Sequence, residues 1–144
     1  MLTYALIHPP LLAALAAAGH GSRILIADGH FPCSTHTNPA AAMIHLNLRP
    51  GLLTVDDVLE PLLGAVPVEH AAVMGSGGDP VPAHDGYRDA LGAHVPFEEV
   101  ERFAFYDLAR TTDTAVVVAT GDQRQYANLL LTVGVAGVTP RKEH

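Results

Sequence analysis

A histidine and an aspartate flank a short apolar segment near the beginning of the chain. His20 lies in a Gly-His-Gly turn, and Asp28 directly follows the run from Arg23 to Ala27, which is apolar after its first residue. Because an unpaired ionised carboxylate inside a sheet is costly, we expect Asp28 at the carboxyl end of a buried strand, with a partner. Ligands of open α/β sheets bind at that edge. His20 is a candidate acid or base, since an imidazole gains or loses a proton near neutral pH.

Two further polar clusters are predicted next to strands. Arg102 precedes Tyr106 by four residues, and Tyr126-Ala127-Asn128 lead into a final apolar segment. Arginine brings several fixed donors, asparagine brings a donor and an acceptor, and tyrosine brings a hydroxyl and an apolar ring face. This set of groups suits a hydroxyl-rich ligand with one apolar face, such as a deoxy sugar.

Periodicity and turn signals predict strands that alternate with helices. Helices are expected from Pro9 to Ala18 with Gly19 as a left-handed stop, from the N-cap Thr54 to about Leu63, and over residues 87–93. Strands are expected over residues 23–27, 42–48, 68–74 and 115–120, with a final apolar segment at 128–135. Residues 99–110 are interpreted as a strand ending near Phe103 and then a helix. The fold class is α/β, a single domain over residues 1–144 with an open sheet between helix layers.

Composition narrows the possible partners and the compartment. Hydrophobic residues make up 49% of the chain and charged residues only 16%, so we expect part of the apolar surface to face other subunits. The net charge of −7 and the scattered basic residues argue against nucleic acid as a binding partner. No apolar run is long enough to cross a membrane. The single cysteine, Cys33, and the absence of positive charge before the first apolar run predict a cytoplasmic protein.

We expect no metal site. The nine histidines include no pair at helical i, i+4 spacing and no cysteine partner at zinc spacing. They are His8, His20, His30, His36, His45, His70, His84, His94 and His144. The glycine-rich stretch at residues 75–80 lacks the ending of a phosphate-binding P-loop and is interpreted as a flexible loop.

Each candidate also has a purely structural interpretation. Taken alone, His20 is a turn histidine bonded to backbone, and Asp28 is a turn or capping residue. Arg102 can form a solvated ion pair with Glu98 or Glu101, worth about 0–1 kcal/mol. Tyr126 and Asn128 can simply begin the last element, with the asparagine as a cap.

The chain resembles the RbsD/FucU family of sugar mutarotases and pyranases, and most of all its L-fucose mutarotase branch. The resemblance extends over nearly the whole length, and the order and spacing of its motifs carry it. These motifs are Gly19-His20-Gly21, Asp28-Gly29-His30-Phe31-Pro32, Arg102-Phe103-Ala104-Phe105-Tyr106, Thr120-Gly121-Asp122, Tyr126-Ala127-Asn128 and Gly134-Val135. Two positions differ from the fucose branch. Ser22 replaces the usual acidic residue, and Ala127 replaces a glycine, as in the ribose branch.

The resemblance implies an open α/β fold assembled into a ring-shaped homodecamer, with sugar sites near subunit contacts and no cofactor. It implies that His20 is the proton donor. It also implies that Asp28, Arg102, Tyr126, Ala127 and Asn128 bind the sugar.

The leading hypothesis from the sequence is therefore a cofactor-independent isomerase that interconverts the anomers of a monosaccharide. L-fucose is the expected substrate. Ring opening needs a proton on the ring oxygen and the loss of one from the anomeric hydroxyl, which an imidazole can assist. One alternative is a non-catalytic sugar-binding module of a transport or regulatory system, and another is a D-ribose pyranase. A purely structural ring protein is a third.

Overall fold

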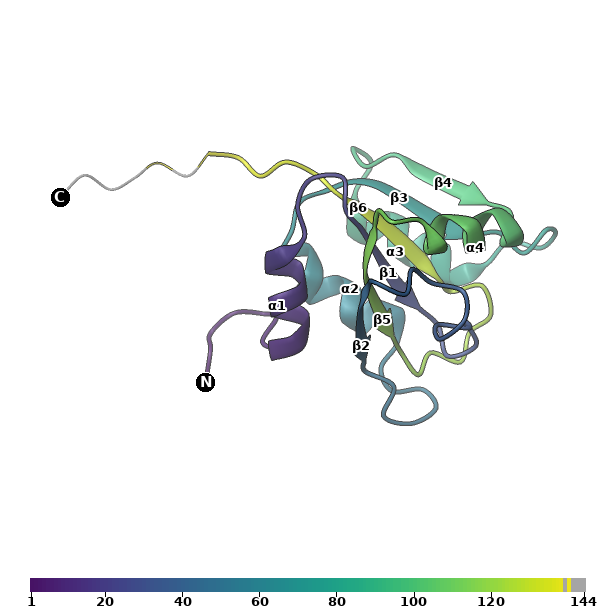
Figure 1. The fold of residues 1–144 in the computed structure, drawn as a ribbon. Coiled ribbons are helices and arrows are strands. Elements are labelled where there is room, and N and C mark those ends of the chain that lie inside the picture. The colour runs from purple at the N-terminus through teal and green to yellow at the C-terminus, as the bar shows by residue number, and fades with distance from the viewer. Residues whose placement is uncertain (139, 141–144) are drawn as a thin grey trace.

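The structure is a computed structural model that describes residues 1–138 and 140. Within these residues one sheet of six strands is combined with four helices (Figure 1). The strands lie in the order β2-β5-β1-β6-β3-β4. In chain order the elements are α1 (Pro9–Ala17), β1 (Arg23–Ala27), β2 (Ala42–His45), α2 (Val55–Leu63), β3 (Val68–Met74), α3 (Pro82–Leu91), β4 (Phe97–Val100), α4 (Arg102–Arg110), β5 (Thr114–Ala119) and β6 (Leu129–Val133).

The sheet is mixed, because its last strand runs against the others. β1 is parallel to β5, β5 to β2, and β3 to β4, whereas β6 lies antiparallel between β1 and β3. The carboxyl ends of five strands and the amino end of β6 therefore meet at one edge of the sheet. We call this the carboxyl edge, and the opposite one the amino edge.

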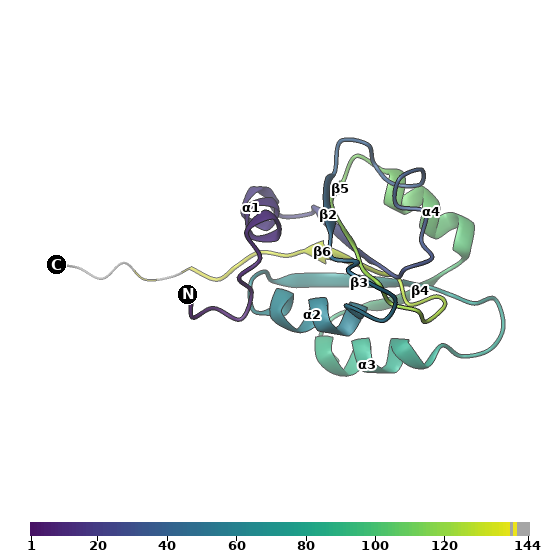
Figure 2. The same ribbon diagram turned by 90° about the horizontal axis from the view of Figure 1, so that it is seen from below.

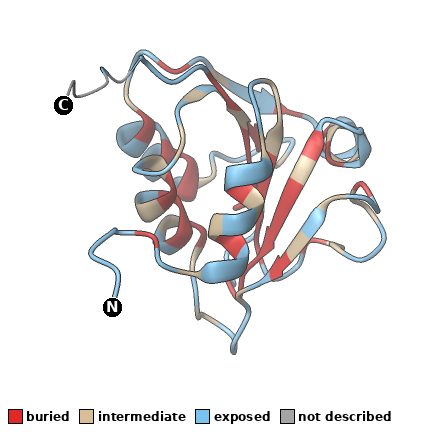
Figure 3. Ribbon diagram, turned by 60° about the vertical axis from the view of Figure 1, so that its left-hand side comes forward, coloured by how far each residue is buried: buried red, intermediate tan, exposed pale blue. Residues whose placement is uncertain are grey.

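Helices cover both faces of the sheet, as the alternation of side chains along β1 requires. Ile24 and Ile26 pack with residues of α1, α2 and α3, whereas Leu25 and Ala27 pack with residues of α4. Figure 2 shows α2 and α3 on one side of the sheet and α4 on the other. The central strands β1, β5 and β6 are mostly buried, while the edge strands β2 and β4 are partly exposed and the helices expose their outer sides (Figure 3). The α/β class predicted from the sequence is confirmed.

Helix α2 shows how the sequence defines an element that supports the carboxyl edge. The Thr54 hydroxyl accepts the Asp57 N–H at 3.2 Å, and the Asp57 carboxylate accepts the Thr54 N–H at 2.9 Å. This reciprocal capping box satisfies two amides that have no partner inside the helix. Val55, Val58, Leu59 and Leu62 are buried on one face.

Several predicted boundaries are wrong for identifiable reasons. Helix α1 ends in an extended Ala18 whose N–H bonds back to the helix, and the residue with positive φ is Gly21 (φ 83°) rather than Gly19. Helix α3 begins at Pro82, which suits a first turn, and not at Tyr87. β4 ends at Val100 because the Glu101 carboxylate caps α4, which includes Phe103. β2 is shorter than predicted because its partner β5 ends at Ala119.

In the described part of the chain, no helix has the length and apolar character needed to span a membrane.

Candidate functional site

A cavity of about 320 Å³ opens at the carboxyl edge. Its walls come from the loop after β1, the end of β3, the start of α4 and the segment before β6. They combine carboxylate, guanidinium, amide and phenol groups with apolar side chains, a composition typical of small-ligand sites. The lining residues are Asp28, His30, Phe31, Met74, Arg102, Tyr106, Gln125, Tyr126 and Asn128.

Asp28 is the most tightly held group of this cavity. One carboxylate oxygen accepts the N–H groups of His30 at 2.9 Å and Phe31 at 3.0 Å, and the other accepts the N–H of Ala127 at 3.1 Å. The residue is only 3% exposed, and burial raises its pKa from 3.8 despite the opposing effect of these hydrogen bonds. The carboxylate thus joins the loop after β1 to the segment before β6, and Asp28 lines the cavity.

The segment before β6 is linked to Asp28 a second time. The side-chain oxygen of Asn128 accepts the Asp28 N–H at 2.7 Å, and its amide group donates to the sulfur of Met74 at 3.9 Å. Tyr126 adopts a positive φ of 58°, which turns the chain so that the next N–H faces the carboxylate. Asp28, Tyr126, Ala127 and Asn128 therefore form one hydrogen-bonded unit.

Helix α3 holds this unit from behind. The His84 Nε2–H donates to the carbonyl oxygen of Tyr126 at 2.8 Å, and the Tyr87 hydroxyl donates to that of Ala127 at 2.7 Å. Both side chains are buried, and burial lowers the pKa of His84, so its ring is neutral at pH 7. The sequence analysis missed both residues, although two polar groups three apart share one face of a helix.

Replacing Tyr87 by phenylalanine is expected to lower the free energy of unfolding by about 1–2 kcal/mol. The Ala127 carbonyl loses its donor in an interior where Tyr87 is 0% exposed, and an unpaired buried acceptor carries this cost. Urea denaturation measures the change. Tyr4→Phe, at a site that is 71% exposed, is the matched control and should leave the midpoint unchanged. Equal midpoints for both variants would contradict the role given to Tyr87.

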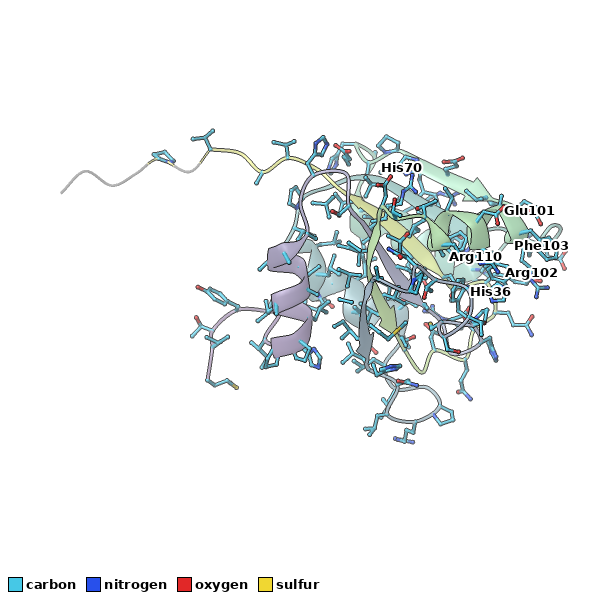
Figure 4. The ribbon with its side chains drawn as sticks, viewed as in Figure 1. His36, His70, Glu101, Arg102, Phe103 and Arg110 are labelled. Atoms are coloured by element: carbon cyan, nitrogen blue, oxygen red, sulfur yellow. The ribbon has the colours of Figure 1, made fainter. Side chains whose placement is uncertain are left out.

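Arg102 and Tyr106 form the opposite wall of the cavity. Arg102 Nε donates to the Tyr106 hydroxyl at 3.1 Å, one helical turn along α4, and this bond raises the pKa of the guanidinium. The Tyr106 ring packs edge-on against Phe31 with centroids 5.4 Å apart. Figure 4 shows Glu101, Arg102, Phe103 and His36 gathered at this end of the molecule. The ion pairs of the described residues include none from Arg102 to Glu98 or Glu101. The Arg102 side chain instead bonds to Tyr106 and lines the cavity.

The Thr120-Gly121-Asp122 motif lies beside the loop that follows Asp28. The Asp122 carboxylate accepts the Val55 N–H at 2.9 Å. It also accepts hydrogen bonds from the Arg124 guanidinium, which forms a second ion pair with Asp56. Burial opposes ionisation of Asp122, but the Arg124 guanidinium and the amides outweigh it and the pKa is lowered. Its carbonyl accepts the Gly29 N–H at 2.8 Å, which ties this cluster to the loop after Asp28.

His20 lies elsewhere. It precedes β1, whereas Asp28 follows it, so the five-residue strand separates them by on the order of 15 Å. At the amino edge the imidazole Nε2 is 2.9 Å from a Glu69 carboxylate oxygen, and the His20 side chain is 57% exposed. Within one chain the structure thus brings together five predicted site residues, Asp28, Arg102, Tyr126, Ala127 and Asn128, but not His20.

Among the described residues, no group of three or more histidine, cysteine or acidic side chains is arranged to hold a metal ion. His144 lies outside the described residues.

One family model matches this chain, and several solved structures are similar to it. The sequence model of the RbsD / FucU transport protein family matches residues 1–136. Bacillus subtilis RbsD complexed with D-ribose has a TM-score of 0.81 and 26% identity, covering 95% of this chain and 100% of that one. FucU from Bifidobacterium longum has a TM-score of 0.78 and 31% identity over 91% of this chain and 97% of that one. The fucose mutarotase from Streptococcus pneumoniae, in complex with L-fucose, has a TM-score of 0.81 and 25% identity over 95% and 100%.

Proposed function

This chain belongs to the RbsD/FucU transport protein family, and on that premise we propose that it is a monosaccharide mutarotase acting on L-fucose. Solved relatives are complexed with D-ribose and with L-fucose, which supports a sugar mutarotase or pyranase as the general class. The observation that carries the proposal is the Asp28 carboxylate. It is held by three backbone amides at the wall of a cavity that also contains a guanidinium and an amide side chain.

The cavity chemistry favours a deoxy sugar. The Asp28 carboxylate is an acceptor for hydroxyl groups, the Asn128 NH₂ group is a donor, and Arg102 supplies donors on the opposite side. Phe31 and Met74 line the same cavity and offer an apolar contact for a C–H face or a methyl group. A sugar with several hydroxyls and one methyl substituent, as in L-fucose, uses both kinds of wall.

In the proposed reaction, the His20 imidazolium donates a proton to the ring oxygen while the C1–O bond of the ring breaks. A water molecule accepts the proton that leaves the anomeric hydroxyl. The electron pair of the broken O–H bond forms the C=O bond of the aldehyde. Rotation of the aldehyde and reversal of both proton transfers close the ring as the other anomer. General acid–base assistance of this kind contributes on the order of 10²–10⁴-fold.

Because His20 and the cavity lie at opposite edges, the proposal requires that His20 of one copy of the chain reaches the cavity of a second copy. Contact between the amino edge of one copy and the carboxyl edge of the next is head-to-tail, and such contacts form a ring when the rotation between copies closes. Apolar side chains exposed near both chain ends, on the side of the molecule away from α4, support an interface there (Figure 1). They include Met1, Leu2, Tyr4, Ile7, Val135 and Val138. The homodecamer and the cytoplasmic location expected from the sequence remain predictions.

Saturation-transfer NMR between the two anomer signals tests the activity, with fucose, ribose, galactose and rhamnose as a panel. We expect exchange of L-fucose to be faster with protein than in buffer. His20→Ala should lower the exchange rate by about 10²–10⁴-fold while much of the sugar affinity remains. His94→Ala, at an exposed position outside the cavity, is the control.

The panel also separates the other candidates. Faster exchange of ribose than of fucose would favour the pyranase. Binding of a sugar without accelerated exchange would favour a non-catalytic sugar-binding module, in which His20→Ala changes only affinity. No sugar-dependent shift in melting temperature would leave a structural ring protein.

A further inference from the structure

Outside the cavity, the most distinctive pairing of titratable groups joins His20 to Glu69 at the amino edge. His20 Nε2 lies 2.9 Å from one oxygen of the Glu69 carboxylate and 3.0 Å from the other. The two side chains are 57% and 45% exposed, so the pair adds little to stability, about 0–1 kcal/mol. Its effect is on the imidazole, because a carboxylate accepts hydrogen bonds and therefore requires the proton to be on Nε2.

A β-bulge places Glu69 in reach of the histidine. Val68 pairs with Val133 and His70 with Thr132, so Glu69 is an extra residue of β3 opposite β6. An extra residue bends the strand and re-aims its side chain. Gly134 makes room for it, since a Cβ there would lie 3.2 Å from the Glu69 Cβ.

The turn that carries His20 is fixed to the same end of β6. The Gly21 N–H donates to the Val133 carbonyl and the Val133 N–H to the Ser22 carbonyl, each at 2.9 Å. β6 pairs with β1 on one side and with β3 on the other. His20 and Glu69 thus meet across the end of one strand, and both are held by the backbone of that strand. Ser22, two residues after His20, carries no charge that could interact with the imidazole.

We propose that Glu69 is the positioning residue for His20, accepting its Nε2–H so that Nδ1 is the nitrogen that exchanges a proton with the sugar. This proposal rests on the proposed function. The carboxylate fixes both the tautomer and the direction of the ring, a role that hydrogen-bonded carboxylates commonly have toward histidines. Within its own chain Glu69 lies at the amino edge and does not line the cavity. It acts only through His20.

Glu69→Gln tests the proposal, because an amide keeps the size of the side chain but can both donate to and accept from the ring. We expect kcat for anomer exchange to fall about 10- to 100-fold, part of what general acid–base catalysis supplies, with KM unchanged. Glu69→Asp keeps the carboxylate and should recover part of the lost rate. Glu98→Gln is the matched control, because Glu98 forms an exposed pair with His70 at 3.3 Å and should show the wild-type rate.

A second measurement does not depend on turnover. The ¹⁵N shifts of the His20 ring, at a pH where it is neutral, should show Nε2–H in the wild type and in Glu98→Gln, and a mixture of tautomers in Glu69→Gln. An unchanged tautomer together with unchanged kcat in Glu69→Gln would overturn the role of Glu69. If the wild type exchanges no sugar, the proposed function fails, and the ring shifts alone then decide whether Glu69 sets the tautomer. Should Glu69→Gln not fold, the same comparison is made with Glu69→Ala, which also removes the carboxylate.

Discussion

Asp28→Ala is expected to lower the free energy of unfolding by about 3 kcal/mol and to weaken sugar binding by about 10- to 100-fold. The substitution leaves the N–H groups of His30, Phe31 and Ala127 without their shared acceptor. Hydrogen bonds to a charged group contribute about 1.5–3 kcal/mol each, and the energy released by removing a buried charge offsets part of their sum. Urea denaturation and calorimetric titration with the sugar measure the two effects.

Asp57→Ala is the control for this prediction. Its carboxylate accepts a single backbone N–H in the capping box of α2, so we expect a loss of about 1 kcal/mol and unchanged sugar affinity. If both variants bind sugar as the wild type does, the carboxylate of Asp28 is not a ligand contact.

The effect of Asp28 on stability also depends on pH. Burial raises its pKa above 3.8, so the folded protein keeps this proton to a higher pH than the unfolded chain. The part of the stability that comes from this retained proton is complete below 3.8 and is lost as the pH rises through the folded pKa. Asp28→Asn removes this titration. The stability of the wild type relative to Asp28→Asn should therefore fall as the pH rises from acid to neutral.

Gly121→Ala is expected to destabilise the protein by about 3 kcal/mol or more. A Cβ at this position would overlap the carbonyl oxygens of Arg49 and Leu52. Both are backbone atoms, which cannot rotate away, so the loop that packs on the carboxyl edge must move. The Gly51 N–H, which donates to the Gly121 carbonyl at 2.7 Å, would move with it. Thermal denaturation is the measurement.

Gly64→Ala provides the comparison. Gly64 has helical φ and ψ of −77° and −14°, and an added Cβ would make an ordinary contact at 3.5 Å. Alanine should therefore raise the stability slightly, by about 0.4–1 kcal/mol. A Gly121→Ala protein as stable as Gly64→Ala would show that the contact with Arg49 and Leu52 yields easily.

The sequence predicts β1, β3 and β5 to within one residue of their observed bounds. β1 and β3 have the predicted bounds, and Asp28 follows β1 at the edge where a ligand site was expected. The antiparallel direction of β6 could not be predicted, because a buried strand reads as an apolar run in either direction. That direction matters for the site, since it brings Tyr126 and Asn128, which precede β6, to Asp28.

The interpretation of His20 shows where sequence spacing is insufficient. Eight positions separate His20 from Asp28, but an extended strand lies between them and sends them to opposite edges. Ser22 stands where the fucose branch has an acidic residue, so the turn itself offers the histidine no carboxylate. Glu69 supplies one through a bulge, and a bulge depends on the register of two strands that are distant in the chain. The hydrogen bonds of His84 and Tyr87 depend on tertiary packing in the same way.

The place of β6 has a consequence for synthesis of the protein. Residues 129–133 occupy the middle of the sheet, between β1 and β3, yet they are made after the other five strands. Until they leave the ribosome, the nascent chain holds two half-sheets whose facing edges have no neighbour. The sheet is therefore expected to be completed only after residue 133 has left the ribosome, and a stop before codon 129 should yield a protein that aggregates or is degraded.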